Sequence, residues 1–369
     1  MIGTPLESGT RTYNLNFCEY INKLNFKQKI YVFISKDYIK NISNKDNPNI
    51  EYIVKSKFLS NIIIRVLWMQ LILPFELKKL NINQLYSPMN LAPIFLKLFN
   101  IKLILTLHSN LPWVFFNKMP GNLIRNFFTR ILMEISISVC DKLIVNSNFA
   151  KNEIMKLLKI QENKIHVVYL GIGKNYLAKN ANEHYLKNLD YKNYVLSVLS
   201  CVKYHNIINL LKAFKLLDKK HSINLKFIFV LQILDKEYFK EIIKFIDNNF
   251  EKGKIIFFHN LENSYLVNLY KNAHFYIFSS YSEVFGLTSL EAMSQKCPVI
   301  ISKSSALPEI NGKAAIYFDP DNELDIKNAM EKVLTNVDYR NELINKGNIH
   351  LKNYNWENTV KETLKILEI

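Results

Sequence analysis

Cysteine and glycine are both scarce in this chain of 369 residues, which has 4 cysteines and 9 glycines. The thiols of Cys18, Cys140, Cys201 and Cys297 are far apart in sequence, so they form neither a metal-binding spacing nor a disulfide framework. We therefore expect reduced, buried thiols. Asn, Lys, Ile, Phe and Tyr are abundant instead, which we interpret as a low-GC coding bias without functional meaning.

A secretory signal peptide is also missing, and no apolar run has the character of a membrane span. The most apolar stretch, residues 58–75, contains Asn61, Arg65 and Gln70, with Pro74 near its end. A buried or interfacial helix fits this pattern better than a span. We expect a cytoplasmic protein, with peripheral attachment at the inner face of the membrane left open.

Acidic residues are in the minority, because 48 Lys and Arg stand against 32 Asp and Glu, a formal net charge of +16. Basic chains favour polyanions such as nucleic acid, anionic membranes or phosphorylated substrates. The lysines are dispersed, and no helix-turn-helix, zinc-finger or RNA-binding signature accompanies them, which argues against nucleic acid. An anionic membrane surface fits better.

The length suggests two domains, and apolar runs alternate with amphipathic stretches throughout. This alternation predicts an α/β protein with parallel sheets wrapped by helices. In the first half we expect strands at 30–34, 50–54, 84–86, 103–107, 142–145 and 166–169, and helices at 13–24, 59–71, 89–98, 124–139 and 150–157. After a polar linker, 171–193, we expect strands at 194–199, 225–230, 254–258, 274–278 and 299–302, and helices at 207–217, 238–248, 264–272 and 356–367.

Residues 279–293 are the most informative segment. They read Ser-Ser-Tyr-Ser-Glu-Val-Phe-Gly-Leu-Thr-Ser-Leu-Glu-Ala-Met and follow an apolar run that predicts a buried strand. A strand, a small-residue turn and a helix start make a usual place for an α/β protein to hold a phosphate. The amides of Gly286, Leu287 and Thr288 would point out of the helix end toward a diphosphate, with the positive end of the helix dipole behind them.

Two carboxylates flank this turn. Glu283, before the turn, could accept hydrogen bonds from sugar hydroxyls, and Glu291, in the first helical turn, could reach two hydroxyls of a ribose. A capping role is the alternative, because Thr288 and Glu291 are spaced as a capping box.

The segment resembles the Glu-x7-Glu signature of retaining GT-B glycosyltransferases of the group 1 / family 4 type. The resemblance continues through 297–302, 304–309 and 312–320. It implies a GT-B architecture of two Rossmann-like, doubly wound domains facing a central cleft. One departure is Lys296, where the family usually has glycine; we expect the turn there to form with a backbone that avoids a positive φ.

The resemblance also divides the chain. It places an N-terminal acceptor domain in 1–172, a donor domain in 173–350, and a C-terminal helix in 351–369 that crosses back onto the first domain. The family's first strand normally precedes a glycine loop by several residues, and residues 1–5 leave almost no room for it. Either the start of the sequence is late, or the first domain lacks most of a central strand, so we expect the first strand to be truncated.

Lys203 and His205 follow the first strand of the second domain. Residues 198–207 resemble the family's donor-phosphate loop, in which one common variant has Arg and Lys at these two places. Two cations just beyond a strand end would neutralise a diphosphate that gains charge as the sugar leaves. Lys203 supplies a fixed charge, and His205 supplies one when protonated. A solvated lysine and a structural histidine are the alternative.

In the first domain, the strand expected at 103–107 ends at His108, and the matching family segment ends in His-Asp. This match gives His108 a role in contacting the transferred sugar or orienting the acceptor; Ser109 replaces the family's carboxylate. Residues 8–13 resemble the N-terminal glycine loop, in which Gly9 would approach the donor phosphates. A structural histidine and an ordinary turn are the alternatives.

The resemblance implies an enzyme that moves a hexose-type sugar from a nucleotide-diphosphate sugar to a glycan or lipid-linked acceptor, with retention, in envelope polysaccharide or lipopolysaccharide synthesis. We expect no metal and no other cofactor, because helix amides and the two cations replace the metal ion. The catalytic candidates are Glu283, His108 and Lys203, and the donor-binding candidates are Gly9, Lys203, His205, Glu283, Phe285, Gly286, Leu287, Thr288 and Glu291. A non-catalytic GT-B binding protein and a sugar-nucleotide epimerase are the alternatives.

Overall fold

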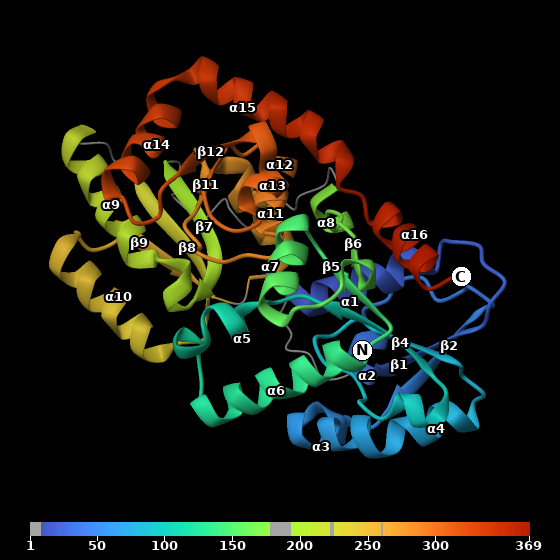
Figure 1. The fold of residues 1–369 in the computed structure, drawn as a ribbon. Helices are drawn as coiled ribbons and strands as arrows, with labels where there is room; N and C mark the ends of the chain where they lie inside the picture. The colour runs from blue at the N-terminus through green and yellow to red at the C-terminus, as the bar shows by residue number, and fades with distance from the viewer. Residues whose placement is uncertain (1–8, 178–192, 222–224, 260) are drawn as a thin grey trace. The chain divides into compact units, whose positions relative to one another are not determined.

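The computed structural model describes residues 9–177, 193–221, 225–259 and 261–369, which form two compact units (Figure 1). Unit 1 comprises Met1–Trp113, Ile124–Gly171 and Asn355–Ile369, and unit 2 comprises Val114–Leu123 and Ile172–Tyr354. Each unit has its own parallel sheet structure. The chain therefore passes from one unit to the other more than once, and nothing in the sequence marks Val114–Leu123 as part of unit 2.

Unit 2 is built on a parallel sheet with the strand order β12-β11-β10-β7-β8-β9. Its strands are β7 (Tyr194–Cys201), β8 (Lys226–Ile233), β9 (Ile255–Phe258), β10 (Tyr276–Phe278), β11 (Val299–Ser302) and β12 (Ala315–Phe318). The side chains of β10 and β11 are all buried, as expected of central strands in a sheet covered on both faces. The order makes β10 and β7 neighbours although they are far apart in sequence.

Short polar side chains begin several helices of unit 2. Asp235 accepts a hydrogen bond from the amide of Tyr238, and Asn336 accepts one from the amide of Tyr339, as N-cap residues do. The helices of this unit are η4 (Phe116–Lys118), α8 (Lys174–Leu177), η7 (Lys203–His205), α9 (Ile207–His221), α10 (Lys236–Asn249), α11 (Asn263–Asn272), α12 (Leu287–Ser294), α13 (Leu307–Asn311), η8 (Gly312–Ala314), α14 (Glu323–Thr335), α15 (Val337–His350) and η9 (Leu351–Asn353).

The strands of unit 1 form two separate parallel sheets. One is the pair β1 (Ile30–Ser35) and β2 (Ile50–Lys55), and the other runs β3 (Gln84–Ser87), β4 (Lys102–Leu107), β5 (Lys142–Val145) and β6 (Ile165–Val167). No strand of the described residues joins β1 to β3, and a cavity of about 780 Å³ is lined by residues of both. The expected truncation of the first strand concerns residues 1–8, which lie outside the described residues.

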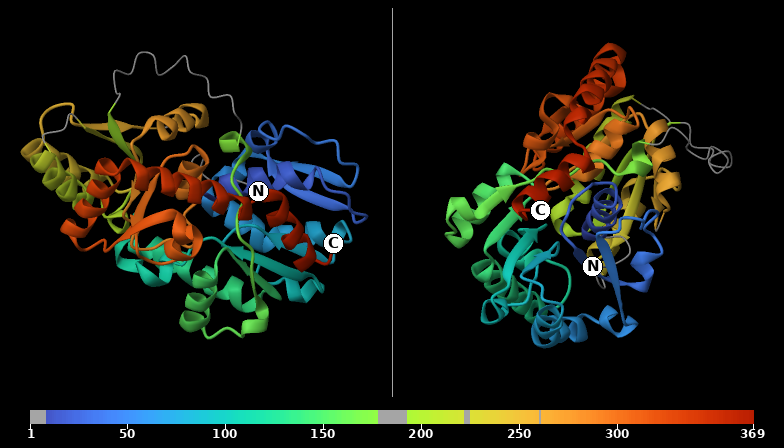
Figure 2. Two further views of the ribbon diagram at one scale, coloured as in Figure 1. Left: turned by 90° about the horizontal axis from the view of Figure 1, so that it is seen from above. Right: turned by 90° about the vertical axis from the view of Figure 1, so that its right-hand side faces the viewer.

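Helix α16 packs against α1 in unit 1 (Figure 2). The ring of Tyr13 meets Trp356 edge-on with centroids 5.4 Å apart, and its hydroxyl lies 2.6 Å from that of Tyr86. The helices at least partly in this unit are α1 (Gly9–Ile21), α2 (Lys36–Ile39), η1 (Lys57–Ser60), α3 (Ile62–Leu67), the π-helical turn η2 (Trp68–Ile72), α4 (Leu73–Lys79), η3 (Leu96–Phe99), α5 (Leu111–Val114), α6 (Leu123–Val139), α7 (Asn148–Leu158), η5 (Glu162–Lys164) and α16 (Trp356–Ile366).

Most of the expected elements are confirmed, but the helix expected at 89–98 is wrong, because only the short η3 forms there. Pro93 disfavours a helix through the residue before it. Side chains satisfy the backbone of this segment instead: Gln70 donates to the carbonyl of Ala92 and accepts from the amide of Ile94, at 3.0 and 2.9 Å.

The expectation that Lys296 avoids a positive φ is also wrong, because its φ is 58°. The amide of Lys296 donates to the carbonyl of Met293, and that of Cys297 donates to Ala292, at 2.9 and 3.0 Å. These bonds close α12 and hold lysine in a conformation that usually selects glycine. The linker expected at 171–193 contains α8, and its residues 178–192 lie outside the described residues.

Candidate active site

Two loops of unit 2 meet because the strands that lead into them are parallel neighbours. The loop after β7 contains η7, and the loop after β10 leads through Glu283 to α12. The amide of Tyr281 donates to the carbonyl of Tyr204 at 2.9 Å, and the hydroxyl of Ser279 donates to the carbonyl of His205 at 2.7 Å. These bonds fix the two loops against each other at the carboxyl edge of the sheet, the usual ligand-binding edge of such folds.

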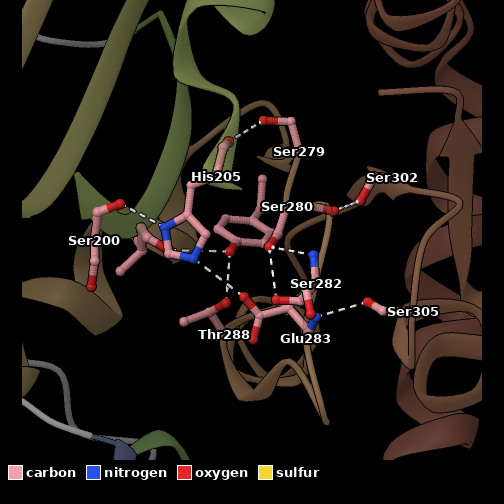
Figure 3. A network of polar contacts seen from close by, with 11 residues as sticks. Ser200, His205, Ser279, Ser280, Ser282, Glu283, Thr288, Ser302 and Ser305 are labelled. Atoms are coloured by element: carbon pink, nitrogen blue, oxygen red, sulfur yellow. Dashed lines mark hydrogen bonds and ion pairs between the residues drawn. The ribbon is translucent and has the colours of Figure 1, made fainter. Parts of the chain in front are cut away.

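His205 and Glu283 form the centre of the resulting polar network (Figure 3). Nε2 of His205 lies 3.3 Å from Oε1 of Glu283, and Nδ1 lies 2.6 Å from the carbonyl oxygen of Ser200. Both partners are acceptors, so the ring satisfies both when each nitrogen carries a hydrogen. The histidine is buried, whereas 23% of the Glu283 side chain stays exposed. The exposed part of the Glu283 carboxylate can therefore contact a ligand, while the contact with buried His205 fixes its position.

The backbone of Glu283 is held by the loop after β11. Its amide donates to the hydroxyl of Ser305 at 2.8 Å, and its carbonyl accepts from the amide of Ala306 at 3.1 Å. Ser305 has a φ of 53°, and Ser302 donates to the carbonyl of Ser280 at 2.5 Å. Ser305 was missed as a site residue, although it lies in the stretch 304–309 that carries the family resemblance.

Gly286 is required at the start of α12. Its φ is 90°, and a Cβ atom there would come within 2.6 Å of a methyl carbon of Leu307. Helix α12 begins directly after it, and the amides of Leu287 and Thr288 make no hydrogen bond to a described residue. The ring of Phe285 is buried edge-on against Tyr354, at 5.9 Å, so this residue could meet a donor only through its backbone.

Thr288 does not form a capping box with Glu291, because no side chain caps α12 and Gly286 is its N-cap residue. The hydroxyl of Tyr276 donates to that of Thr288 at 2.7 Å. Glu291 is the fifth residue of α12, so the expectation that it lies in the first turn is wrong. The alternative that Glu291 only caps the helix is therefore wrong, because its carboxylate accepts no hydrogen bond from the amides at the start of α12.

Glu291 is a buried carboxyl group under two tyrosines. The hydroxyl of Tyr270 donates to Oε2 at 3.5 Å, and Tyr176 of α8 also hydrogen-bonds the carboxyl group. Burial raises the pKa of Glu291 to about 7, against the smaller lowering effect of the two tyrosines. No pattern in the sequence identifies Tyr176 and Tyr270 as neighbours of this site.

Lys203 points toward α10 in this structure. Its ammonium lies 3.4 Å from Oε1 of Glu241, and both side chains are about half exposed, at 47% and 51%. Such a surface ion pair is weak, so it fixes the lysine only loosely. The structure therefore brings His205 to Glu283, and it pairs Lys203 with a different carboxylate.

His108 and Gly9 belong to unit 1. Nε2 of His108 lies 3.2 Å from the carbonyl oxygen of Pro88, and Nδ1 lies 3.1 Å from the side-chain nitrogen Nδ2 of Asn146, so both ring nitrogens have a partner. Burial lowers the pKa of His108 to about 4, so the ring is neutral at pH 7. Gly9 is the first residue of α1 and not a loop residue, and a Cβ atom there would meet nothing within 4 Å.

No group of three His, Cys, Asp or Glu side chains in the described part of the chain is placed to hold a metal ion. Asp319 and Asp321 have the spacing of a metal-binding Asp-x-Asp motif, but Asp319 accepts from the amide of Asp321 at 2.9 Å. Asp321 also accepts from the hydroxyl of Tyr281 at 2.5 Å. Within the described residues, no helix is both long and apolar enough to cross a membrane.

The fold and the site together define the class of protein. A glycosyltransferase from Rickettsia africae is similar over 98% of this chain and 95% of its own, with a TM-score of 0.73 and 17% identity. HepE from Anabaena, solved with UDP and glucose, is similar over 99% and 97%, with a TM-score of 0.74 and 14% identity. The fold is GT-B, with two Rossmann-like domains.

Two family models match nearly the whole chain between them. The model of glycosyltransferase family 4 matches residues 8–174, and that of the group 1 glycosyl transferases matches residues 178–350. The chain belongs to the glycosyltransferases of this group 1 / family 4 type, which confirms the resemblance.

Curated relatives are similar at lower coverage. The O-antigen chain mannosyltransferase RfbU of Salmonella typhimurium is 22% identical over 72% of this chain and 73% of its own. The O-antigen chain mannosyltransferase B of Escherichia coli is 25% identical over 60% of this chain and 59% of its own.

Proposed function

We propose that this chain is a retaining, metal-independent glycosyltransferase that moves a hexose from a nucleotide-diphosphate sugar to a glycan or lipid-linked acceptor in envelope polysaccharide synthesis. The pairing of Glu283 with His205 beside the start of α12 is the observation that carries this proposal. It brings a carboxylate and an imidazole to the same sheet edge as two helix amides that bond to no described residue. The relatives that act as O-antigen chain mannosyltransferases support the polysaccharide class.

The donor diphosphate would bind at the amino end of α12. The amides of Leu287 and Thr288, with the helix dipole behind them, suit an anion. His205, when protonated, adds a positive charge beside them. Lys203 would leave its weak pair with Glu241 to add a second. These groups stabilise the charge that develops on the leaving diphosphate, the role a metal ion would otherwise have.

The sugar and the ribose would be held by different carboxylates. Glu283 accepts hydrogen bonds from the hydroxyls of the transferred hexose, and Glu291 accepts them from the ribose after Tyr176 or Tyr270 gives way. In the reaction, the bond between the anomeric carbon and the phosphate oxygen breaks, and the acceptor oxygen bonds to the same face of that carbon. The acceptor proton goes to the leaving phosphate, so the site needs no strong base of its own.

Release of nucleoside diphosphate from a panel of sugar nucleotides, supplied with candidate acceptors, tests the proposal directly. Glu283→Gln should lower the rate of release by about 100-fold or more, and Glu342→Gln, a change at an exposed, paired glutamate of α15, should leave it unchanged. Retention would be read from the anomeric configuration of the product by NMR. Binding of nucleotide without release from any donor would support the non-catalytic alternative and overturn the proposal.

A further inference from the structure

Exposed apolar side chains are concentrated in one segment of unit 1, residues 58–98. Ten of the 24 exposed large hydrophobic residues of the described chain come from η1, α3, η2, α4 and η3, counting Phe95, the residue directly before η3. Phe58, Ile63, Phe75 and Leu98 are 77%, 67%, 65% and 80% exposed. We call these ten residues the apolar surface: Phe58, Ile62, Ile63, Ile64, Leu67, Leu71, Ile72, Phe75, Phe95 and Leu98. A concentration of this size marks an interaction site.

The helices that carry the apolar surface are anchored in the core of unit 1. Trp68, Leu73 and Leu77 point inward from η2 and α4 and are buried, so the same helices present a second apolar face outward. The rings of Phe75 and Phe99 meet edge-on with centroids 5.0 Å apart, which joins η3 to α4. Figure 1 shows α3 and α4 following one another along one side of the unit.

Four exposed lysines belong to the segments that carry the apolar surface. Lys57, Lys78, Lys79 and Lys97 are exposed and form no ion pair with a described residue. Glu76, the acidic residue of α4, is neutralised by Lys55 at 2.8 Å. These lysines therefore carry an uncompensated positive charge, in keeping with the net charge of +16.

We propose that the apolar surface binds the interface of an anionic lipid bilayer, with α3 and α4 lying in the membrane plane. Apolar side chains enter the acyl boundary, and the four lysines meet anionic headgroups, the combination that holds interfacial helices. A twofold contact between two copies would bring the same lysines face to face, which disfavours a dimer through this surface. Helix α3 has 6 residues and helix α4 has 7, so neither is long enough to span the bilayer.

The binding itself is independent of glycosyl transfer, since none of these residues belongs to the donor site. Its use to the enzyme rests on the proposed function, because a bilayer-bound enzyme meets a lipid-linked acceptor in the membrane where that acceptor is held. Vesicle binding and nucleotide binding can therefore fail separately.

Cosedimentation of the full chain with phosphatidylcholine vesicles, with and without phosphatidylglycerol, tests the proposal. The wild type should bind the anionic vesicles and lose that binding at high salt. The double variant Ile63→Ser, Phe75→Ser should bind roughly tenfold more weakly. Its matched control, Leu324→Ser, Ile349→Ser, changes two residues of unit 2 that are 62% and 68% exposed, and should bind as the wild type does.

A charge series separates the two parts of the interaction. Lys78→Glu, Lys79→Glu should weaken binding to anionic vesicles severalfold, whereas Lys313→Glu, Lys352→Glu, at exposed lysines of unit 2, should not. Nucleoside-diphosphate affinity, measured by calorimetry, should be unchanged in all four variants, which also shows that they fold. Three results would each overturn the proposal. The wild type does not bind the vesicles, the controls lose as much vesicle binding as the test variants do, or light scattering shows a dimer that the double variant Ile63→Ser, Phe75→Ser dissociates.

Discussion

Replacing Glu291 by glutamine should change how the stability of unit 2 depends on pH. The carboxyl group is buried beneath Tyr176 and Tyr270, and burial raises its pKa from 4.5 to about 7. A raised folded-state pKa means that the folded protein holds a proton that the unfolded chain releases. This contribution to stability is complete below about pH 4.5 and is lost as the pH rises through about 7.

The size of the effect follows from the shift. At about 1.4 kcal/mol per pKa unit, the wild type should lose about 3 kcal/mol of stability across this window relative to Glu291→Gln, whose amide does not titrate. For a unit of this size, that corresponds to a change of about 6–12 °C in the difference between the two melting temperatures.

Thermal unfolding of both proteins between pH 5 and pH 8, with Glu342→Gln as the exposed control, measures this difference. As the pH rises, the melting temperature of the wild type should fall relative to that of Glu291→Gln. The control Glu342→Gln should show the same pH dependence as the wild type. If the difference in melting temperature between wild type and Glu291→Gln does not vary with pH, the raised pKa of Glu291 is refuted, and with it the interpretation of a buried, neutral carboxyl group.

The same residue should link nucleotide binding to protons. In the proposed function a ribose donates hydrogen bonds to Glu291, which would favour its ionised form, so nucleotide binding near pH 6 should release on the order of one proton. Calorimetry in buffers of different ionisation enthalpy measures the release. Glu291→Gln should abolish it and weaken nucleoside-diphosphate affinity by about 1–3 kcal/mol. If affinity is unchanged while the stability effect persists, the carboxyl group is structural.

Other predictions concern turnover, metal dependence and backbone strain. Glu283→Gln should lower kcat by about 100-fold or more with nucleoside-diphosphate affinity nearly intact; equal losses of both would contradict its assignment to the sugar. His205→Asn should lower kcat more than nucleoside-diphosphate affinity, because it acts on the leaving diphosphate and Glu283 is its partner; a loss of affinity with kcat intact would contradict its role in turnover. Activity should survive chelation by EDTA, and loss that magnesium or manganese restores would contradict metal independence. Lys296→Gly should raise the melting temperature by relieving about 1 kcal/mol of strain at φ 58°. A lower melting temperature would mean that contacts of the lysine side chain contribute more than this strain costs.

Local sequence is sufficient for most of the strands and helices. The apolar run of β10 and the small residues after it predict a strand, a turn and a helix, and the structure confirms α12 directly after Gly286. A glycine at φ 90° and a short apolar strand are properties of a few neighbouring residues, so their pattern is visible in the chain itself. The family resemblance is local in the same sense, because it rests on residues in register along one segment.

Tertiary structure decides what these local patterns do. His205 meets Glu283 only because β7 and β10 are neighbours in the sheet, and no local rule orders strands that are far apart in sequence. The burial of Glu291 depends on Tyr176 and Tyr270, which come from two other helices. Lys296 adopts a positive φ that its own preferences oppose, and the hydrogen bonds that close α12 hold it there. Pairing, burial and strain each depend on groups that are distant in sequence, so they follow from the folded chain and not from the pattern of its residues.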